Sequence, residues 1–216
     1  GGETPKKGEI FKNPLLANTY KSIASTYGRS FYEGSIAEEI VKTLNKNGNP
    51  MNLNDLGRFL PEWIDPVSTN YRGYDVWELP PNGQGIAALQ ILNILENYNI
   101  RDMGLDSAEY IHLFTEAKKL AFEDRAKYYA DPNFSSIPTD ILISKDYSSE
   151  RLKLIDLNSA AQRYDAGLEN GDTIYLTVAD SFGNMVSLIQ SNYRGMGSGV
   201  IPNNTGFMLQ DRGEMF

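Results

Sequence analysis

The chain has 216 residues, 41% hydrophobic and 22% charged, a globular composition with room for one large or two small domains. Its 28 acidic and 20 basic side chains give a formal net charge of −8, which argues against nucleic acid or an anionic membrane surface as a ligand, because either needs a basic face. The chain has no cysteine, so disulfides, thiolate metal sites and a Cys nucleophile are excluded. It has one histidine, His112, which any Ser-His-Asp mechanism would have to use.

The sequence does not decide between a cytoplasmic and a periplasmic or extracellular location. No apolar run reaches the roughly 18 residues of a membrane-spanning helix. No signal peptide is visible, but the chain begins with Gly1-Gly2 rather than Met, so we expect a trimmed piece of a longer precursor.

Three helices are expected in the first 60 residues. An Asn-Pro pair opens residues 13–28 with a cap residue followed by proline at the first helical position, and a glycine closes this segment. Ser35 and Glu38 have the spacing of a capping box and predict a second helix through Leu44. Asn52 opens a short third helix.

The next segment predicts a strand pair and a buried helix. Residues 66–71 and 74–79 read as strands joined by a tight turn at Arg72-Gly73. Residues 86–96 are apolar nearly all round, which is typical of a buried helix.

A long helix and an irregular stretch come next. Asp106 and Glu109 have capping-box spacing and predict a helix through about Tyr129. Residues 130–172 are rich in Ser, Asp, Asn and Pro and predict irregular structure, with a short helical piece near residues 148–155.

The last segment of the chain, residues 173–216, changes to alternating apolar and polar residues, which predicts a β-hairpin. With a three-residue loop that ends at Gly183 in the left-handed conformation, Asp180 pairs with Asn184. Counting back along both strands then pairs Thr173 with Ser191, and opposed residues have Cβ atoms about 5 Å apart. A Thr–Ser pair is common in sheets, so this pairing assigns no chemistry by itself. Helices first and strands last predict an α+β fold.

Two glycine motifs are candidate binding sites. Gly83 to Ala88 fit the dinucleotide pattern G-x-G-x-x-A, but the preceding strand belongs to a hairpin, and Pro80-Pro81 removes two backbone donors. We therefore expect a tight turn with close packing of the helix start.

Gly195 to Gly199 are not followed by a helix, so Ser198 is not a nucleophile of the elbow type. A tightly turned loop and a loop that wraps a substrate both remain open there.

Two further sets of polar residues are expected to be structural. His112 flanks an apolar helix face and has no partner at the spacing of a zinc site. Glu123 and Asp124 are expected to form ion pairs rather than to act in acid–base chemistry.

Seven separated stretches resemble γ-glutamyltransferases and occur in the order seen in that family. The similarity covers nearly the whole chain, and the stretches are specific together, although each is weak alone. The stretches are Gly8–Pro14, Phe31–Ala37, Tyr71–Tyr74, Pro80–Gly85, Gln90–Leu95, Asp124–Pro132 and Asp172–Asn184.

The resemblance implies an N-terminal nucleophile hydrolase with a four-layer αββα sandwich, made as a zymogen that cleaves itself. The position that matches the family's nucleophile is Thr173, so the scissile bond would be Asp172–Thr173. Residues 1–172 would then be the C-terminal part of the large subunit, and residues 173–216 the N-terminal part of the small subunit. Ser191 matches a family hydroxyl that hydrogen-bonds the nucleophile. The partners implied are a small γ-glutamyl or acyl-amide substrate, as in glutathione metabolism, and the remainder of the precursor chain.

The chemistry of an N-terminal threonine fits the composition. Once Thr173 is freed, it carries an α-amine with a pKa of about 7.7–8.0, which can accept the proton of its own hydroxyl. One residue thus supplies the nucleophile and the base, and no cysteine, histidine, metal or cofactor is needed. The acyl-enzyme would pass its acyl group to water or to an amine. Gly171 would let the backbone bend at the scissile bond.

Departures from the family pattern affect the substrate. The family's small subunit usually starts with Thr-Thr-His, and the matching residues here are Thr173-Ile174-Tyr175. At the positions that commonly bind the α-amino and α-carboxylate of a γ-glutamyl group, this chain has Tyr193, Arg212 and Met215 in place of the usual Asn, Gln and Asp. The Asp would bind a substrate ammonium, whereas an arginine binds a carboxylate in bidentate fashion. We expect an acyl group with a terminal carboxylate and no ammonium, such as glutaryl. The alternative for Arg212 is an ion pair with a neighbouring carboxylate, Asp211 or Glu214.

The family's Gly-Gly oxyanion hole would lie beyond Phe216, and its removal costs about 10²–10³ in rate, so residues 1–216 alone are expected to be inactive. The alternative to an enzyme is a non-catalytic structural or partner-binding domain derived from a degenerate relative.

Overall fold

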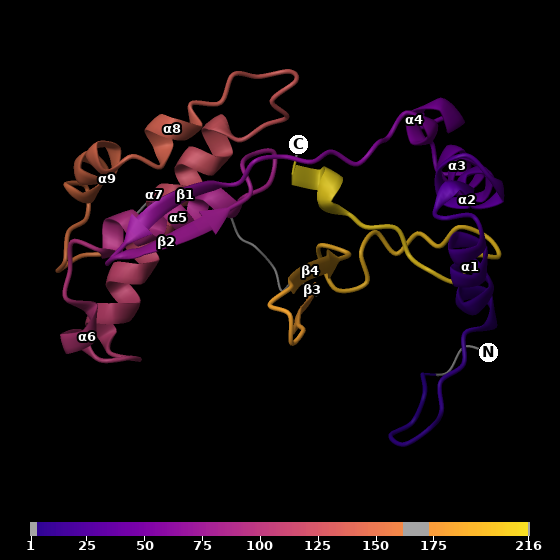
Figure 1. The fold of residues 1–216 in the computed structure, drawn as a ribbon, viewed down its shortest axis with the longest axis horizontal. Helices are drawn as coiled ribbons and strands as arrows, with labels where there is room; N and C mark the ends of the chain where they lie inside the picture. The colour runs from indigo at the N-terminus through magenta and orange to yellow at the C-terminus, as the bar shows by residue number, and fades with distance from the viewer. Residues whose placement is uncertain (1–3, 162–172, 216) are drawn as a thin grey trace. The chain divides into compact units, whose positions relative to one another are not determined.

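A computed structural model of the chain describes residues 4–161 and 173–215, with the backbone alone described at residues 173–175, 214 and 215. The chain divides into two compact units (Figure 1). The terminal unit comprises residues 1–61 and 167–216, and the central unit comprises residues 62–166. The terminal unit holds residues from both sides of the predicted subunit boundary at 172/173. Because compactness does not test a cleavage boundary, that division stays a prediction.

The first helix of the terminal unit begins as the sequence predicts. In α1 (Pro14–Ser25) the Asn13 side chain caps the helix by accepting a 3.0 Å hydrogen bond from the backbone of Leu16. The helix ends before the predicted residue 28. A further short helix that the sequence pattern did not predict, α2 (Arg29–Tyr32), comes next.

Of the next two helices, the first lacks the predicted capping box and the second has one. In α3 (Ser35–Lys46) Gly34 occupies the cap position and Ser35 is already helical, so the predicted capping box is wrong. In α4 (Leu53–Gly57) Asn52 and Asp55 do form a capping box, with 2.8 Å between Asn52 N and Asp55 Oδ2.

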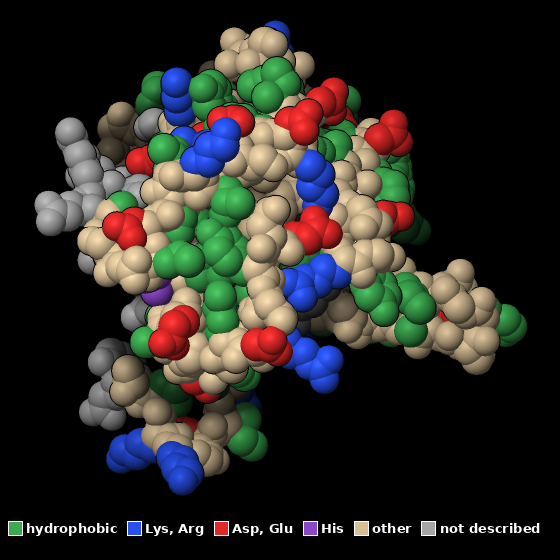
Figure 2. All heavy atoms as spheres, turned by 90° about the vertical axis from the view of Figure 1, so that its left-hand side faces the viewer, with side chains coloured by type: hydrophobic (Ala, Val, Ile, Leu, Met, Phe, Trp, Pro, Cys, Tyr) green, Lys and Arg blue, Asp and Glu red, His purple; other side chains and the backbone are tan. Residues whose placement is uncertain are grey.

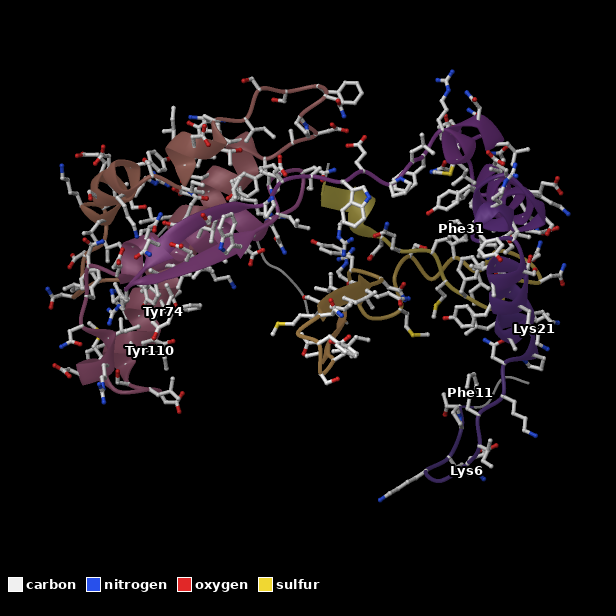
Figure 3. All side chains as sticks on the ribbon, viewed as in Figure 1. Lys6, Phe11, Lys21, Phe31, Tyr74 and Tyr110 are labelled. Carbon is white, nitrogen blue, oxygen red and sulfur yellow. The ribbon has the colours of Figure 1, made fainter. Side chains whose placement is uncertain are left out.

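Residues 205–207 of the terminal unit lie against its first two helices. Thr19 and Asn13 donate side-chain hydrogen bonds of 2.7 and 2.8 Å to backbone carbonyls of this segment. Phe31, labelled in Figure 3, packs against Phe207 with ring centroids 6.0 Å apart. Segments nearly 200 residues apart in sequence are therefore fixed together within one unit.

The central unit begins with the predicted strand pair. β1 (Val67–Tyr71) and β2 (Tyr74–Glu78) are antiparallel, with Tyr71 opposite Tyr74. Arg72 and Gly73 form the two-residue turn with φ values of 53° and 92°, the left-handed values that this hairpin type requires.

Two long helices form the core of the central unit. The prediction of a buried helix is confirmed by α5 (Gly85–Leu95), which contacts β1, β2 and α7 (Ala108–Tyr128) (Figure 1). The cap of α7 is Ser107 and not Asp106, because the Ser107 side chain accepts the hydrogen bond from Tyr110 N. Short helices α6 (Ile100–Met103), α8 (Thr139–Leu142) and α9 (Lys145–Leu152) complete the unit.

Buried aliphatic side chains join these helices. Leu89 of α5 and Leu142 of α8 lie in one cluster, and Leu113 and Leu120 of α7 lie in another with Leu95 of α5. Each such side chain stabilises the unit by about 1.5–3 kcal/mol relative to an exposed position. On the face drawn in Figure 2, basic and acidic side chains are interspersed around hydrophobic ones.

A polar network crosses the same core. Asp124 is 4% exposed and accepts hydrogen bonds from Gln90 (2.7 Å) and Tyr147 (2.9 Å). Arg151 lies 3.3 Å from Asp124 and equally far from Glu123, so the predicted ion pairing of these two carboxylates is confirmed. Burial, with the hydrogen bond to Asp124, raises the pKa of the Tyr147 phenol to about 12.

The chain closes with the predicted hairpin, β3 (Thr173–Ala179) and β4 (Met185–Ser191), followed by a short 3₁₀ helix, η1 (Arg212–Met215). Leu176 and Leu188 oppose each other and are 41% and 47% exposed. Helices fill the first part of the chain and the β3–β4 hairpin lies in the last, so the α+β prediction is confirmed.

Candidate functional site

The candidate site lies at the open end of the β3–β4 hairpin. The strands pair in the predicted register, with Thr173 opposite Ser191. The loop is also as predicted, because Asp180 N donates to Asn184 O at 3.0 Å and Gly183 has a left-handed φ of 84°. The backbone thus brings the two hydroxyl-bearing residues to facing positions. The Thr173 side chain lies outside the description, as do Gly171 and Asp172.

Ser191 connects this end of the hairpin to the next segment of the chain. Its Oγ accepts a hydrogen bond of 2.9 Å from the backbone N–H of Tyr193. Tyr193 has a φ of 77°, a left-handed conformation that costs about 1–3 kcal/mol for a residue with a side chain. Such a conformation persists where the surrounding contacts determine it.

The structure brings Tyr193 and Arg212 together. The Arg212 guanidinium lies 5.5 Å from the centroid of the Tyr193 ring, within the range of a cation–π contact. Among the described side chains, the hydrogen-bond partner of Arg212 is Gln210 at 3.2 Å. A guanidinium in a cation–π contact still has N–H groups with which it can bind a carboxylate. The Met215 side chain lies outside the description.

The expected alternative for Arg212, an ion pair with Asp211, is not formed. Asp211 instead pairs with Arg194, with 3.0 Å between Nε and Oδ2. Desolvation raises the pKa of the Asp211 carboxyl, but hydrogen bonds from the backbone and side chain of Arg194 outweigh it and lower that pKa below the ordinary value. The Glu214 side chain, the other partner considered, lies outside the description. Sequence reasoning missed the Arg194–Asp211 pair.

The glycine-rich loop is tightly turned. Ser198 donates to the Leu209 carbonyl twice, from its backbone N and from its Oγ, both at 2.9 Å. Leu209 N in turn donates to Val200 O at 2.9 Å. The Ser198 hydroxyl is therefore engaged with the backbone.

The dinucleotide motif is a packing feature. β2, which precedes it, belongs to an antiparallel pair and not to a βαβ unit. A Cβ on Gly85 would come within 2.6 Å of Glu78 Oε2 and 2.9 Å of Leu79 O. Glycine is therefore needed for the close approach of the α5 start to β2, as expected.

The remaining polar candidates are structural. His112 Nε2 hydrogen-bonds the backbone carbonyl of Asp156 at 2.8 Å. No group of three or more potential metal-ligating side chains occurs within residues 4–161 and 173–215. Across the same residues, no helix combines the length and the apolar character that a bilayer crossing demands.

A family model described as gamma-glutamyltranspeptidase matches residues 1–216, the whole chain. The chain belongs to the γ-glutamyltranspeptidase family. It is 41% identical over 216 residues to the glutathione hydrolase-like YwrD proenzyme of Bacillus subtilis (strain 168), an alignment that covers 100% of this chain and 41% of that protein. It is 36% identical over 216 residues to the acylase ACY 1 proenzyme of Pseudomonas sp. (strain SE83), with 94% of this chain and 38% of that protein covered.

Solved structures agree with this assignment. The crystal structure of cephalosporin acylase from Bacillus halodurans matches this γ-glutamyltranspeptidase family member with a TM-score of 0.82 and 42% identity, covering 98% of this chain and 38% of that chain. The expected N-terminal nucleophile hydrolase fold is therefore confirmed. The chain spans about two fifths of the length of these relatives.

Proposed function

We propose that the chain is the processing and acyl-binding region of an amide-cleaving enzyme whose nucleophile is Thr173, acting on a γ-glutamyl or glutaryl-like acyl group. The observation that carries the proposal is the register of the hairpin, which sets Thr173 opposite Ser191 in a chain that matches the family along its whole length. The composition supports it, because the chain has no cysteine and its single histidine is bound to a backbone carbonyl.

Processing would begin with attack of the Thr173 hydroxyl oxygen on the carbonyl carbon of Asp172. The new C–O bond replaces the peptide C–N bond, and the proton from the hydroxyl goes to the nitrogen that becomes the α-amine. Water then hydrolyses the ester, leaving a carboxylate on Asp172 and restoring the hydroxyl. Residues 1–172 and 173–216 would then belong to the large and small subunits.

Turnover would reuse the same oxygen. The free α-amine of Thr173 accepts the hydroxyl proton while the oxygen attacks the substrate amide carbon, and the departing amine takes up that proton. The resulting ester is an acyl-enzyme, which passes the acyl group to water or to another amine. Ser191 is proposed to hydrogen-bond the nucleophile and orient it.

The acyl group is proposed to carry a terminal carboxylate. Arg212, whose guanidinium lies over the Tyr193 ring, offers a cation with N–H donors, which suits a carboxylate. At the position of the family's ammonium-binding Asp the chain has Met215, which offers no charge to an ammonium. Glutaryl amides are therefore proposed to be better substrates than γ-glutamyl amides.

Intact-mass analysis of the full-length protein tests the nucleophile. We expect two fragments, the second beginning with Thr-Ile-Tyr, and a single uncut chain for Thr173→Ala. Thr177→Ala is the matched control, because Thr177 lies on the same strand and opposes Ser187, another Thr–Ser pair. The control should cleave like the wild type.

The outcome also decides the rival function. A wild-type protein that stays as one chain would support a non-catalytic domain, whereas a Thr173→Ala variant that still cleaves at this bond would refute Thr173 as the nucleophile. The substrate proposal is tested separately by comparing glutaryl and γ-glutamyl anilides on mature enzyme. Faster turnover of the γ-glutamyl compound would refute the role given to Arg212 and Met215.

A further inference from the structure

The Arg194–Asp211 ion pair flanks the proposed carboxylate site on both sides. Arg194 directly follows Tyr193, and Asp211 directly precedes Arg212. We infer that this ion pair is a positioning device, which fixes Tyr193 and Arg212 in the arrangement that receives the carboxylate of the acyl group. The inference rests on the proposed function, because it assigns a supporting role in that same site.

The Asp211 carboxylate makes two of the three hydrogen bonds that connect the segment before Arg212 to the segment around Tyr193. Asp211 Oδ1 accepts the backbone N–H of Arg194 at 3.2 Å, and Oδ2 accepts the Nε–H of the same residue at 3.0 Å. The backbone N–H of Asp211 donates to Asn192 O at 3.3 Å. Three hydrogen bonds therefore tie the residue before Arg212 to the residues on either side of Tyr193.

This connection accounts for the unusual backbone of Tyr193. The residue has a φ of 77°, and its own N–H is held by Ser191 Oγ. With Asn192 and Arg194 both bound to Asp211, the backbone has anchored neighbours on each side. The Tyr193 ring is thereby held beneath the Arg212 guanidinium, with its centroid 5.5 Å away.

The charges also favour this role over that of an ordinary surface ion pair. Asp211 is the carboxylate nearest to Arg212 in sequence and would compete with a substrate carboxylate for that guanidinium. Its binding to Arg194 removes the competitor, and the Asp211 side chain is 14% exposed. Arg212, which is exposed, is left to face an anionic ligand.

The test compares two anilides on the mature full-length enzyme, one with a glutaryl group and one with a pentanoyl group, which lacks the terminal carboxylate. For Asp211→Asn we expect the KM of the glutaryl anilide to rise about tenfold, as for the loss of one charge-assisted hydrogen bond. The kcat for this substrate and the KM of the pentanoyl anilide should stay within about twofold, because only binding of the carboxylate is weakened.

The matched control is Asp180→Asn, which alters another carboxylate that accepts backbone N–H groups, those of Phe182 and Asn184 in the hairpin loop. The control should leave the ratio of the two KM values unchanged. Equal effects of Asp211→Asn on both anilides, or an effect no larger than that of the control, would overturn the inference.

A second measurement separates this inference from the proposed function. Failure of the wild type to cleave itself or to turn over either anilide would refute the proposed function. Isothermal titration of glutarate onto the wild type and Asp211→Asn then decides the inference without turnover. We expect about tenfold weaker binding to the variant, and equal affinities, or no binding to the wild type, would refute the positioning role.

Discussion

Replacing Asp124 by alanine should loosen the central unit around α9 more than any surface change on that helix. The carboxylate is almost fully buried and accepts hydrogen bonds from Gln90 and Tyr147, and it pairs with Arg151. Truncation leaves the donors of the buried Gln90 and the half-buried Tyr147 without this acceptor, at about 1–3 kcal/mol each. Arg151 keeps Glu123, 3.3 Å away, so its loss is partly compensated. The two losses together amount to about 2–6 kcal/mol, a range that includes the about 3–5 kcal/mol typical of breaking a buried ion pair.

Hydrogen exchange measured by mass spectrometry on the full-length protein is the suitable assay, because it reports the local free energy of opening and needs no two-state unfolding of the whole chain. Amides of α7 and α9 should exchange faster in Asp124→Ala. Tyr147→Phe removes one of the two donors and should cost about 1–2 kcal/mol. The double variant should cost less than the two single costs together, because both remove the same hydrogen bond.

The control for this experiment is Glu150→Ala. Glu150 also lies in α9 and pairs with Lys153 at 2.7 Å, but the two side chains are 70% and 67% exposed. Such a pair contributes about 0–1 kcal/mol. If Asp124→Ala and Glu150→Ala gave the same exchange in α9, the buried network would not be what holds this helix.

The shifted pKa values of two groups predict effects of pH. The pKa of Tyr147 is raised to about 12, so its contribution to folding stability is present below the unfolded-state pKa of about 10 and is lost as the pH rises through 12. The protection factors of the α9 amides, which compare the measured exchange rate with the intrinsic rate at the same pH, should therefore fall at high pH, and less so in Tyr147→Phe. The pKa of Asp180 is lowered, chiefly by the hydrogen bond from the Asn184 side chain, so its contribution is present above the ordinary pKa and is lost as the pH falls through the lowered value. NMR of the loop amides should show Phe182 losing protection in acid in the wild type, whereas in Asp180→Asn its protection should not change over this range.

Local and periodic features of the fold were predictable from sequence. The register of β3 and β4 followed from a three-residue loop that ends at Gly183, because side chains alternate with a period of two and one turn fixes every pair. The burial of α5 followed from a helix-length run with almost no polar face. Short helices such as α2 and α8 were missed, because four residues span little more than one turn and show no period.

Caps and non-local contacts were less predictable. Ser35 has capping-box spacing, but the extended cap conformation falls on Gly34, and spacing alone does not specify that backbone angle. For Arg212 the sequence offered a neighbouring carboxylate, Asp211 or Glu214, as the alternative partner. The structure pairs Asp211 with Arg194, 17 residues away. The turn at Tyr193 that makes this possible is not predicted by any local sequence pattern.

The hairpin itself shows why residue type cannot identify the nucleophile. β3 and β4 contain two Thr–Ser pairs, Thr173 with Ser191 and Thr177 with Ser187, and the pairs are identical in composition and in register. The two pairs differ in the backbone after each serine, because Ser187 continues as strand, whereas Ser191 binds Tyr193 at the start of a constrained turn. Under the proposed function, the chemistry belongs to the pair at the open end because only there does the chain turn back and bring Arg212 over the Tyr193 ring. Position in the fold, rather than the pair of hydroxyls, therefore distinguishes Thr173 from Thr177.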